Sequence, residues 1–226
     1  AIAGQWLFVF DARSGGRLAA WQAHKKDIEA VASSRDGSLV ASASDDGTLA
    51  LWKPDGSPLR TIAGGLGEML GVAVSPAGDR VAGGGGDTAI RLVSSETGAV
   101  EHVLELPMAC PVLAFSPDGR TLAAGSVDGT VTLWDTASGS AKGTLGRYLV
   151  PVGAVAFSAN GKRLASTSLS MNPSTVEAEA RVWDLDTRKE TLTPIGISSW
   201  NAAGFAPNGR PLVAGIHDRT ISVWEL

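Results

Sequence analysis

The sequence predicts an all-β fold in which four-stranded antiparallel sheets recur about every forty residues. Three observations predict it. Glycine-containing turns recur at a nearly constant interval, an apolar residue follows most of them at a fixed distance, and short strand-like runs alternate with turn residues. Helical periodicity is absent, because no window places apolar residues at positions i, i+3, i+4 and i+7.

The spacing of the turns defines the repeat. The turn glycines lie 41, 41, 42 and 48 residues apart, at Gly37, Gly78, Gly119, Gly161 and Gly209. Fifteen residues after four of these glycines comes an apolar anchor residue, and in the repeat that follows Gly161 seven extra residues intervene. The anchors are Phe10, Trp52, Val93, Trp134, Trp183 and Trp224. Because Phe10 keeps the same spacing, the N-terminus is expected to be a partial repeat.

Within one repeat, turn residues separate the predicted strands. Residues 112–116, 121–126 and 130–134 are strand-like, and a fourth run begins at Ala141. Asp-Gly and Asn-Gly pairs supply the positive φ angles of tight hairpins, so neighbouring runs should pair antiparallel. One such sheet cannot bury both of its apolar faces, so successive sheets are expected to stack face to face around an axis. The predicted architecture is a β-propeller.

We expect a single domain over residues 1–226. It would contain a partial repeat at 1–27, repeats near 28–68, 69–109, 110–150 and 151–198, and a partial repeat at 199–226. The chain therefore covers five to six blades. Residues 17–22 could complete the last blade and close a five-bladed ring, or the chain could be an open arc of a seven- or eight-bladed ring. The arc is favoured because residues 1–11 would have no place in the smaller ring, and its open edges would favour association.

Composition narrows the classes of partner. The chain has 19 basic and 23 acidic residues and a formal charge of −4, which argues against nucleic acid as a partner. No apolar stretch reaches eighteen residues, so no membrane span is expected. The single Cys110 lies in a strand-like run and is interpreted as a buried structural thiol. The chain opens inside a strand-like run without an initiator Met, so we expect it to be part of a longer protein.

Several motifs recur in register with the anchors. They are Ser-Pro-Asp-Gly at 116–119, Ser-Asp-Asp-Gly-Thr at 44–48, Gly-Thr-Val-Thr-Leu-Trp-Asp at 129–135 and Val-Trp-Asp at 182–184. Together they resemble the WD-repeat family over essentially the whole chain.

The resemblance implies a buried hydrogen-bonded tetrad in each regular repeat. One repeat carries all four of its residues, which are His24, Ser42, Asp46 and Trp52. Elsewhere the Asp persists at Asp87, Asp128 and Asp218, while the serine position holds Gly83, Ala124 and Ala214 and the His is missing. We therefore expect the other networks to be incomplete or completed by water.

The sequence offers few places for catalysis. His24, His102 and His217 lack a second His at metal-ligand spacing, and no G-x-S-x-G elbow is present. The glycine run 83–86 could suggest a phosphate cradle, but no helix follows it, so a flexible or closely packed hairpin is favoured. We expect no enzyme activity, no metal and no cofactor.

In the WD-repeat family, partners commonly dock on the face where the loops between blades gather. Register places these candidates there: Asp27, Glu29, Asp45, Glu68, Leu70, Trp200 and Asn201, with Met171 and Asn172 in an insertion at 169–179. The acidic residues suggest a basic or mixed peptide, although an ordinary solvated rim would look the same. The insertion is either a recognition loop or a tolerated extension, and Trp200 is either a core residue or an aromatic anchor.

The predicted function is a non-catalytic protein–protein interaction scaffold, or a regulatory or assembly domain of a larger protein. Its partner would be a protein or peptide that binds the propeller face. The alternative is an enzyme or small-ligand-binding propeller with a site on the central channel. That alternative requires convergent polar groups on the channel axis, which the sequence does not place there. A purely structural segment is a third possibility.

Overall fold

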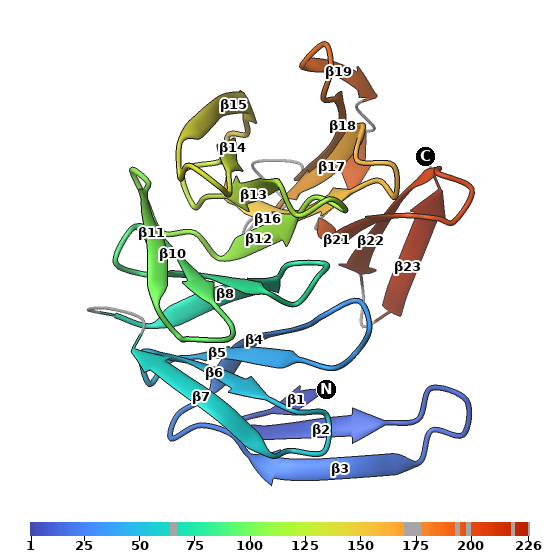
Figure 1. Cartoon of the computed structure of the whole chain (residues 1–226). Coiled ribbons are helices and arrows are strands. Elements are labelled where there is room, and N and C mark those ends of the chain that lie inside the picture. The colour runs from blue at the N-terminus through green and yellow to red at the C-terminus, as the bar shows by residue number, and fades with distance from the viewer. Residues whose placement is uncertain (64–66, 170–177, 193–194, 198–199, 218–219, 226) are drawn as a thin grey trace. The chain divides into compact units, whose positions relative to one another are not determined.

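The computed structural model describes residues 1–63, 67–169, 178–192, 195–197, 200–217 and 220–225. Every regular element among them is a β-strand, and the strands form six antiparallel sheets in sequence order (Figure 1). These observations confirm the predicted all-β fold of recurring antiparallel sheets. The chain falls into two compact units, residues 1–111 and 112–226.

The first unit contains three sheets in which each strand pairs with the next along the chain. The first sheet contains β1 (Ile2–Ala3), β2 (Trp6–Phe10) and β3 (Arg17–Gln22). The second contains β4 (Ile28–Ser33), β5 (Val40–Ser44), β6 (Thr48–Trp52) and β7 (Pro58–Ala63). The third contains β8 (Met69–Val74), β9 (Arg80–Gly85), β10 (Ala89–Ser94) and β11 (Val100–Glu105).

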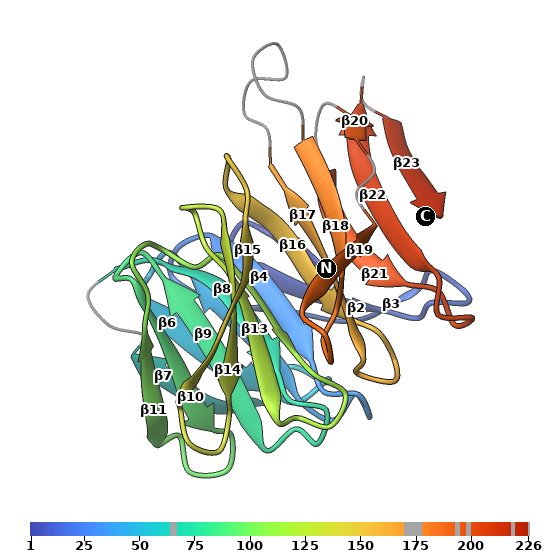
Figure 2. The ribbon, with the colours of Figure 1, turned by 90° about the horizontal axis from the view of Figure 1, so that it is seen from above.

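The second unit also contains three sheets. The fourth sheet contains β12 (Val112–Phe115), β13 (Thr121–Gly125), β14 (Thr130–Asp135) and β15 (Ala141–Arg147). The fifth contains β16 (Val152–Phe157), β17 (Arg163–Ser168), β18 (Ala178–Asp184) and β19 (Lys189–Leu192), and β20 (Ile195–Ile197) also pairs with β18 (Figure 2). The sixth contains β21 (Trp200–Phe205), β22 (Pro211–His217) and β23 (Thr220–Glu225).

Within each unit the sheets stack through their first strands. β4 contacts β8 in the first unit, and β16 contacts both β12 and β21 in the second. The second and third strands of the complete sheets are buried on both faces, as in β5 and β6, whereas a fourth strand such as β7 is largely exposed. A strand covered on both sides carries a continuous run of apolar and small residues, which is the pattern that the sequence shows.

The apolar cores lie between successive sheets. Leu49 and Leu51 of the second sheet pack with Met69, Val72 and Val81 of the third. In the second unit, the corresponding core joins Val131 of the fourth sheet, Trp183 of the fifth sheet and Tyr148 of the loop between them. Stacking therefore buries the faces that one sheet alone would leave open to water.

The strand-like run that opens the chain forms two strands rather than one. Gly4 adopts a φ of 55°, and the chain reverses there to form the two strands β1 and β2. β3 then pairs with β2 along the first sheet, from Trp6 opposite Gln22 to Phe10 opposite Arg17. Residues 17–22 thus belong to the first sheet, which leaves the five-bladed closure without its outer strand.

The glycine run lies in the hairpin of β9 and β10, as the sequence suggested, and it is the closely packed form of the two that were expected. Gly83, Gly84 and Gly85 are the last residues of β9, and only Gly86 lies beyond it. A Cβ atom on Gly84 would lie 2.5 Å from the carbonyl oxygen of Cys110, and one on Gly85 would lie 2.4 Å from that of Glu68. Because these glycines have no side chain, the backbone at Cys110 and at Glu68 can approach β9 closely.

Candidate functional site

Two kinds of loop meet at one end of the sheets, which we call the rim. One kind joins a fourth strand to the first strand of the next sheet, and the other joins a second strand to a third. Backbone hydrogen bonds connect them: the Asp45 N–H donates to the Asp27 carbonyl at 3.0 Å, and the Gly86 N–H donates to the Glu68 carbonyl at 3.0 Å. In the second unit the Val152 N–H donates to the Ser126 carbonyl at 3.1 Å. The rim is thus held by the main chain.

A β-bulge lies at the rim end of four first strands. In β4 the pairing passes from Ile28 to Ala30, so the intervening residue has no partner in the ladder. The same shift occurs in β8, β16 and β21. The residues left out of the ladder are Glu29, Leu70, Gly153 and Asn201. A bulge of this kind re-aims the side chain of the extra residue, as for Glu29 in β4.

Four carboxylates gather at the rim of the first unit, and we call them the acidic patch: Asp27, Glu29, Asp45 and Glu68. Asp27, Glu29 and Glu68 are exposed, and Asp45 is half-buried. The pKa of Glu29 is raised above its usual 4.5, first by partial burial and then by the negative charges of Asp45, Asp27 and Glu68. The exposed Lys25 and Lys26 lie in the same loop as Asp27. The patch is therefore a site of net negative charge in which the carboxylates repel one another.

The other candidate contact residues lie on β8, on β21 or outside the described residues. Leu70 is half-buried on β8, in the first unit. Trp200 and Asn201 begin β21 in the second unit. Met171 and Asn172 lie outside the described residues, as does most of the 169–179 insertion.

The second sheet contains a buried network of polar side chains. The Trp52 Nε1–H donates to Ser42 Oγ at 3.0 Å, and Ser42 Oγ lies 2.7 Å from His24 Nε2. On the other side of the imidazole ring, Nδ1 lies 3.2 Å from Asp46 Oδ2. Asp46 also accepts the backbone N–H of Lys25 at 2.9 Å. This chain of contacts ties the loop before β4 to the turn between β5 and β6.

The electrostatics assign the protons of this network. Burial lowers the pKa of His24, although the charge of Asp46 opposes the shift. Burial also acts to raise the pKa of Asp46, but hydrogen bonds from Thr48, Lys25 and His24 prevail and lower it. A neutral His24 then donates from Nδ1 to the Asp46 carboxylate and accepts the Ser42 hydroxyl proton at Nε2. Every polar group of the network is satisfied in this arrangement.

The fifth sheet contains a similar network that the sequence analysis missed. The Tyr148 hydroxyl lies 2.6 Å from Ser166 Oγ, and the Trp183 Nε1–H donates to the same oxygen at 2.8 Å. Tyr148 is 18 residues before Ser166, and His24 is also 18 residues before Ser42. Tyr148 thus takes the place of the histidine. The seven-residue insertion hid this match, because it separates Ser166 from Trp183 by 17 positions, whereas Ser42 and Trp52 are 10 positions apart.

Arg181 covers the tyrosine of this second network. Its guanidinium carbon lies 4.3 Å from the centre of the Tyr148 ring, and its Nη2 lies 2.6 Å from Glu179 Oε2. Burial raises the pKa of Tyr148 far above its usual 10.0. Burial thus favours the neutral, protonated form of the Tyr148 hydroxyl.

The third and fourth sheets lack a complete network. In the third sheet Arg91 Nη2 lies 2.5 Å from Asp87 Oδ2, and Gly83 and Val93 occupy the serine and tryptophan positions. In the fourth sheet Ala124 occupies the serine position, and the buried Trp134 Nε1–H has no hydrogen-bond acceptor within the described part of the chain. An unpaired buried donor costs free energy.

Ala124→Ser should therefore stabilise the protein by about 1 kcal/mol, because the new hydroxyl can accept the Trp134 Nε1–H. Ser42 of the second sheet and Ser166 of the fifth occupy the same register position and accept the corresponding Trp Nε1–H. Ala123→Ser is the matched control, since Ala123 is equally buried but lies on the opposite face of β13, and it should destabilise. Urea unfolding of both variants measures the difference. An Ala124→Ser protein no more stable than the parent would contradict the assignment of the unpaired donor.

Two other features, a metal site and a membrane-spanning helix, were sought among the described residues. No group of three or more His, Cys, Asp or Glu side chains is placed there to hold a metal ion. None of the elements there is a helix long and apolar enough to cross a bilayer.

Recurring four-stranded sheets that stack through their first strands, with a His–Ser–Trp network inside one of them, define a propeller-type repeat protein. A family profile described as WD domain, G-beta repeat matches residues 15–53 and 110–135. This match and the fold support a WD-repeat family for the chain.

Curated relatives agree with this assignment. The chain is 30% identical to the WD repeat-containing protein SL1-17 of Schistosoma mansoni over 150 residues, which cover 66% of this chain and 50% of the relative. It is 25% identical to autophagy-related protein 16 of Arabidopsis thaliana over 96% of this chain and 43% of that protein. Eukaryotic translation initiation factor 3 subunit I of Aspergillus terreus is 37% identical over 45% of this chain and 30% of its own length. The chain thus spans half or less of these relatives.

A solved structure supports the fold. A chain in the crystal structure of a mitotic checkpoint complex matches with a TM-score of 0.84 and 18% identity. The match covers 99% of this chain and 70% of that chain. The predicted β-propeller fold is confirmed by this likeness.

Proposed function

We propose that this chain is a non-catalytic interaction scaffold, and that its acidic patch binds a basic segment of a protein partner. The observation that carries the proposal is the gathering of Asp27, Glu29, Asp45 and Glu68 at one rim. Partial burial and the negative charges of the other three carboxylates raise the pKa of Glu29 there. Relatives described as a translation initiation factor subunit and an autophagy-related protein support a role in protein association.

The physical basis of binding is relief of repulsion. The four carboxylates carry like charges that repel one another. A cationic side chain of the peptide offsets this repulsion, so its binding here is favourable. The rim loops are held by backbone hydrogen bonds, so the patch loses little conformational entropy when a peptide docks. Lys25 and Lys26 flank the patch, so the favoured peptide would place its basic residues over Glu29 and Glu68 rather than beside the lysines.

Charge reversal tests the proposal. We expect Glu29→Lys with Glu68→Lys to reduce binding of a lysine- and arginine-containing octapeptide by more than about tenfold, because two attractive contacts become repulsive. Binding of the same peptide to the parent protein should weaken as salt rises. Glu96→Lys is the matched control, because Glu96 is an exposed carboxylate in the turn between β10 and β11, at the opposite end of the sheet. Isothermal titration calorimetry measures the affinity of the peptide for the parent protein, the double charge-reversal variant and the Glu96→Lys control.

Neutralisation separates a binding role from a structural one. Glu29→Gln should weaken peptide binding while leaving the melting temperature equal or higher, since it removes repulsion within the patch. Equal affinity of the parent and the double charge-reversal protein would exclude the acidic patch as the binding site.

A further inference from the structure

A polar pocket of about 400 Å³ lies at the rim of the second sheet, beside the acidic patch. It is formed by the end of β3, the loop before β4, the turn between β5 and β6, and the strands β6 and β7. The polar residues that line it are Gln22, His24, Lys25, Asp46, Thr48 and Thr61. Its volume is within the range of ligand pockets, so it has room for a side chain of a bound partner.

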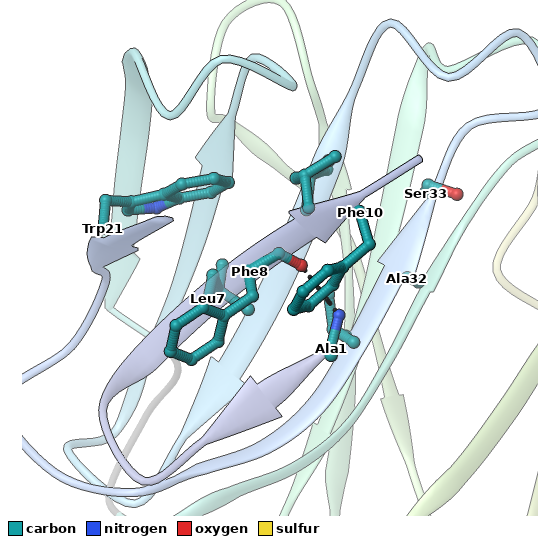
Figure 3. Close-up of a pocket in the computed structure, with 10 residues that line it drawn as sticks. Ala1, Leu7, Phe8, Phe10, Trp21, Ala32 and Ser33 are labelled. Atoms are coloured by element: carbon teal, nitrogen blue, oxygen red, sulfur yellow. Dashed lines mark hydrogen bonds between the residues drawn. The ribbon is translucent and has the colours of Figure 1, made fainter. Parts of the chain in front are cut away.

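The strand that leads into this pocket is held against the second sheet. Trp21, near the end of β3 (Figure 3), has its ring centre 5.8 Å from that of Trp52. A Cβ atom on Gly56 would lie 2.8 Å from the Trp21 ring, so the two residues are in close contact. Just beyond the strand, the Ala23 N–H donates to the Gln5 carbonyl at 2.9 Å. This wall of the pocket is therefore formed before a partner binds, which lowers the entropic cost of binding.

The acidic residue of the pocket, Asp46, is already held by hydrogen-bond donors. It accepts the Lys25 N–H at 2.9 Å and the Thr48 hydroxyl at 2.5 Å, and it lies 3.2 Å from His24 Nδ1. These donors offset its negative charge. The proton of the Thr48 hydroxyl is thereby committed within the second sheet.

Two other donors of the pocket are available to a ligand. Among the described residues, neither the Lys25 ammonium nor the Thr61 hydroxyl has a hydrogen-bond or ion-pair partner. Both residues are exposed. Because one of these donors is charged, the group that fits them best is an anion with two acceptor oxygens.

We propose that this pocket binds a carboxylate side chain of the same partner segment whose basic residues contact the acidic patch. The inference rests on the function proposed above and defines the partner further, since an acidic residue must accompany the basic ones. The carboxylate accepts hydrogen bonds from the Lys25 ammonium and the Thr61 hydroxyl. Opposite charges at two neighbouring places also fix the direction in which the segment lies.

The chain itself limits the spacing of the two kinds of residue in the partner. Lys25 precedes Glu29 by four residues, and four residues of chain span at most about 14 Å. Asp45 of the acidic patch and Asp46 of the pocket are consecutive. The acidic residue of an extended partner segment therefore lies within about four residues of the basic residue that contacts Glu29.

Peptides that differ in one side chain test the inference. The basic octapeptide is extended by Ala-Ala-Glu at its C-terminus or by Glu-Ala-Ala at its N-terminus, and each extension is also made with glutamine. All peptides are acetylated and amidated, so that no terminal charge contributes. We expect one of the two glutamate peptides to bind at least about fivefold more tightly than its glutamine analogue, and the other to show no gain. Isothermal titration calorimetry measures these affinities.

Variants of the protein locate the contact. Lys25→Gln should abolish the gain from glutamate without weakening the binding of the unextended octapeptide, because it removes only the partner of the carboxylate. Thr61→Val keeps the shape of the side chain and should reduce the gain, since it removes one donor. Lys26→Gln and Lys53→Gln are the matched controls and should retain the gain. Both are exposed lysines that do not line the pocket, and Lys53 lies in the turn between β6 and β7, at the opposite end of the sheet.

The outcomes separate this inference from the function on which it rests. If the octapeptide binds but glutamate gives no gain at either end, or an equal gain at both, the carboxylate site is excluded and the acidic patch remains a binding site. A gain that Lys26→Gln abolishes and Lys25→Gln leaves intact would also overturn the inference, because the contact would then lie outside the pocket. If the octapeptide does not bind the parent protein, the proposed function fails and the inference fails with it. Circular dichroism melts establish that each variant is folded.

Discussion

Trp52→Ala should lower the free energy of unfolding by about 3 to 5 kcal/mol, the usual range for removing a large buried side chain. Trp52 is 8% exposed, packs with Leu7, Ile28 and Ala50, and lies 5.8 Å from the ring of Trp21. Its loss leaves a cavity between the first and second sheets. It also removes the donor to Ser42, so a network that is otherwise satisfied loses one contact.

Urea unfolding followed by circular dichroism measures this effect. Trp6→Ala is the matched control, because Trp6 is the same residue type in the neighbouring sheet but is 46% exposed. We expect it to cost less than about 1 kcal/mol. Equal costs for the two substitutions would contradict the role of Trp52 as a buried anchor.

Gly84→Ala should destabilise the protein by about 3 kcal/mol, at the upper end of the range for overpacking a core. The new methyl group would lie 2.5 Å from the carbonyl oxygen of Cys110, and a backbone atom cannot move aside as a flexible side chain can. Relief would require a shift of β9 or of the loop that contains Cys110. Either shift would disturb the packing of the third sheet.

Gly86→Ala is the control from the same glycine run. A Cβ atom at Gly86 would have no neighbour within 4 Å, and this residue does not adopt a positive φ. We expect its melting temperature to stay within a degree or two of the parent's, as for most open surface substitutions. A Gly84→Ala protein as stable as Gly86→Ala would show that the run is not closely packed.

The repeat pattern of the sequence predicted the fold well, for a physical reason. Stacked sheets impose the same burial on every unit, so the turn glycines and the anchors recur at a nearly constant interval. In the structure Gly37, Gly78, Gly119, Gly161 and Gly209 all adopt φ angles between 70° and 84°, as their hairpins require. Periodicity is a property of the whole chain and survives the loss of a motif in any one repeat.

The details of the polar networks were harder to predict. Tyr148 replaces a histidine through a hydroxyl group in the same place, and no rule based on residue identity anticipates that exchange. Arg91 pairs with Asp87 from within the strand, in a sheet where neither the serine nor the tryptophan is present. Only the three-dimensional register shows that these unlike residues lie at equivalent positions.

The candidate site was predictable as a set of positions but not as an arrangement. Register placed Asp27, Glu29, Asp45 and Glu68 at strand ends and turns, which is where the structure has them. The bulge that leaves Glu29 out of the ladder depends on local backbone geometry and carries no clear sequence signal.

The pKa of Glu29, followed by carboxyl-carbon NMR with and without the basic octapeptide, tests the proposed binding site most directly. In the free protein it should lie above 4.5, because partial burial and the charges of Asp45, Asp27 and Glu68 disfavour the ionised form. A peptide that binds the charged carboxylate must lower this pKa, since any ligand that prefers the deprotonated state makes the proton bind more weakly. We predict a fall on saturation with peptide. A bound peptide that leaves the pKa of Glu29 unchanged would contradict the account.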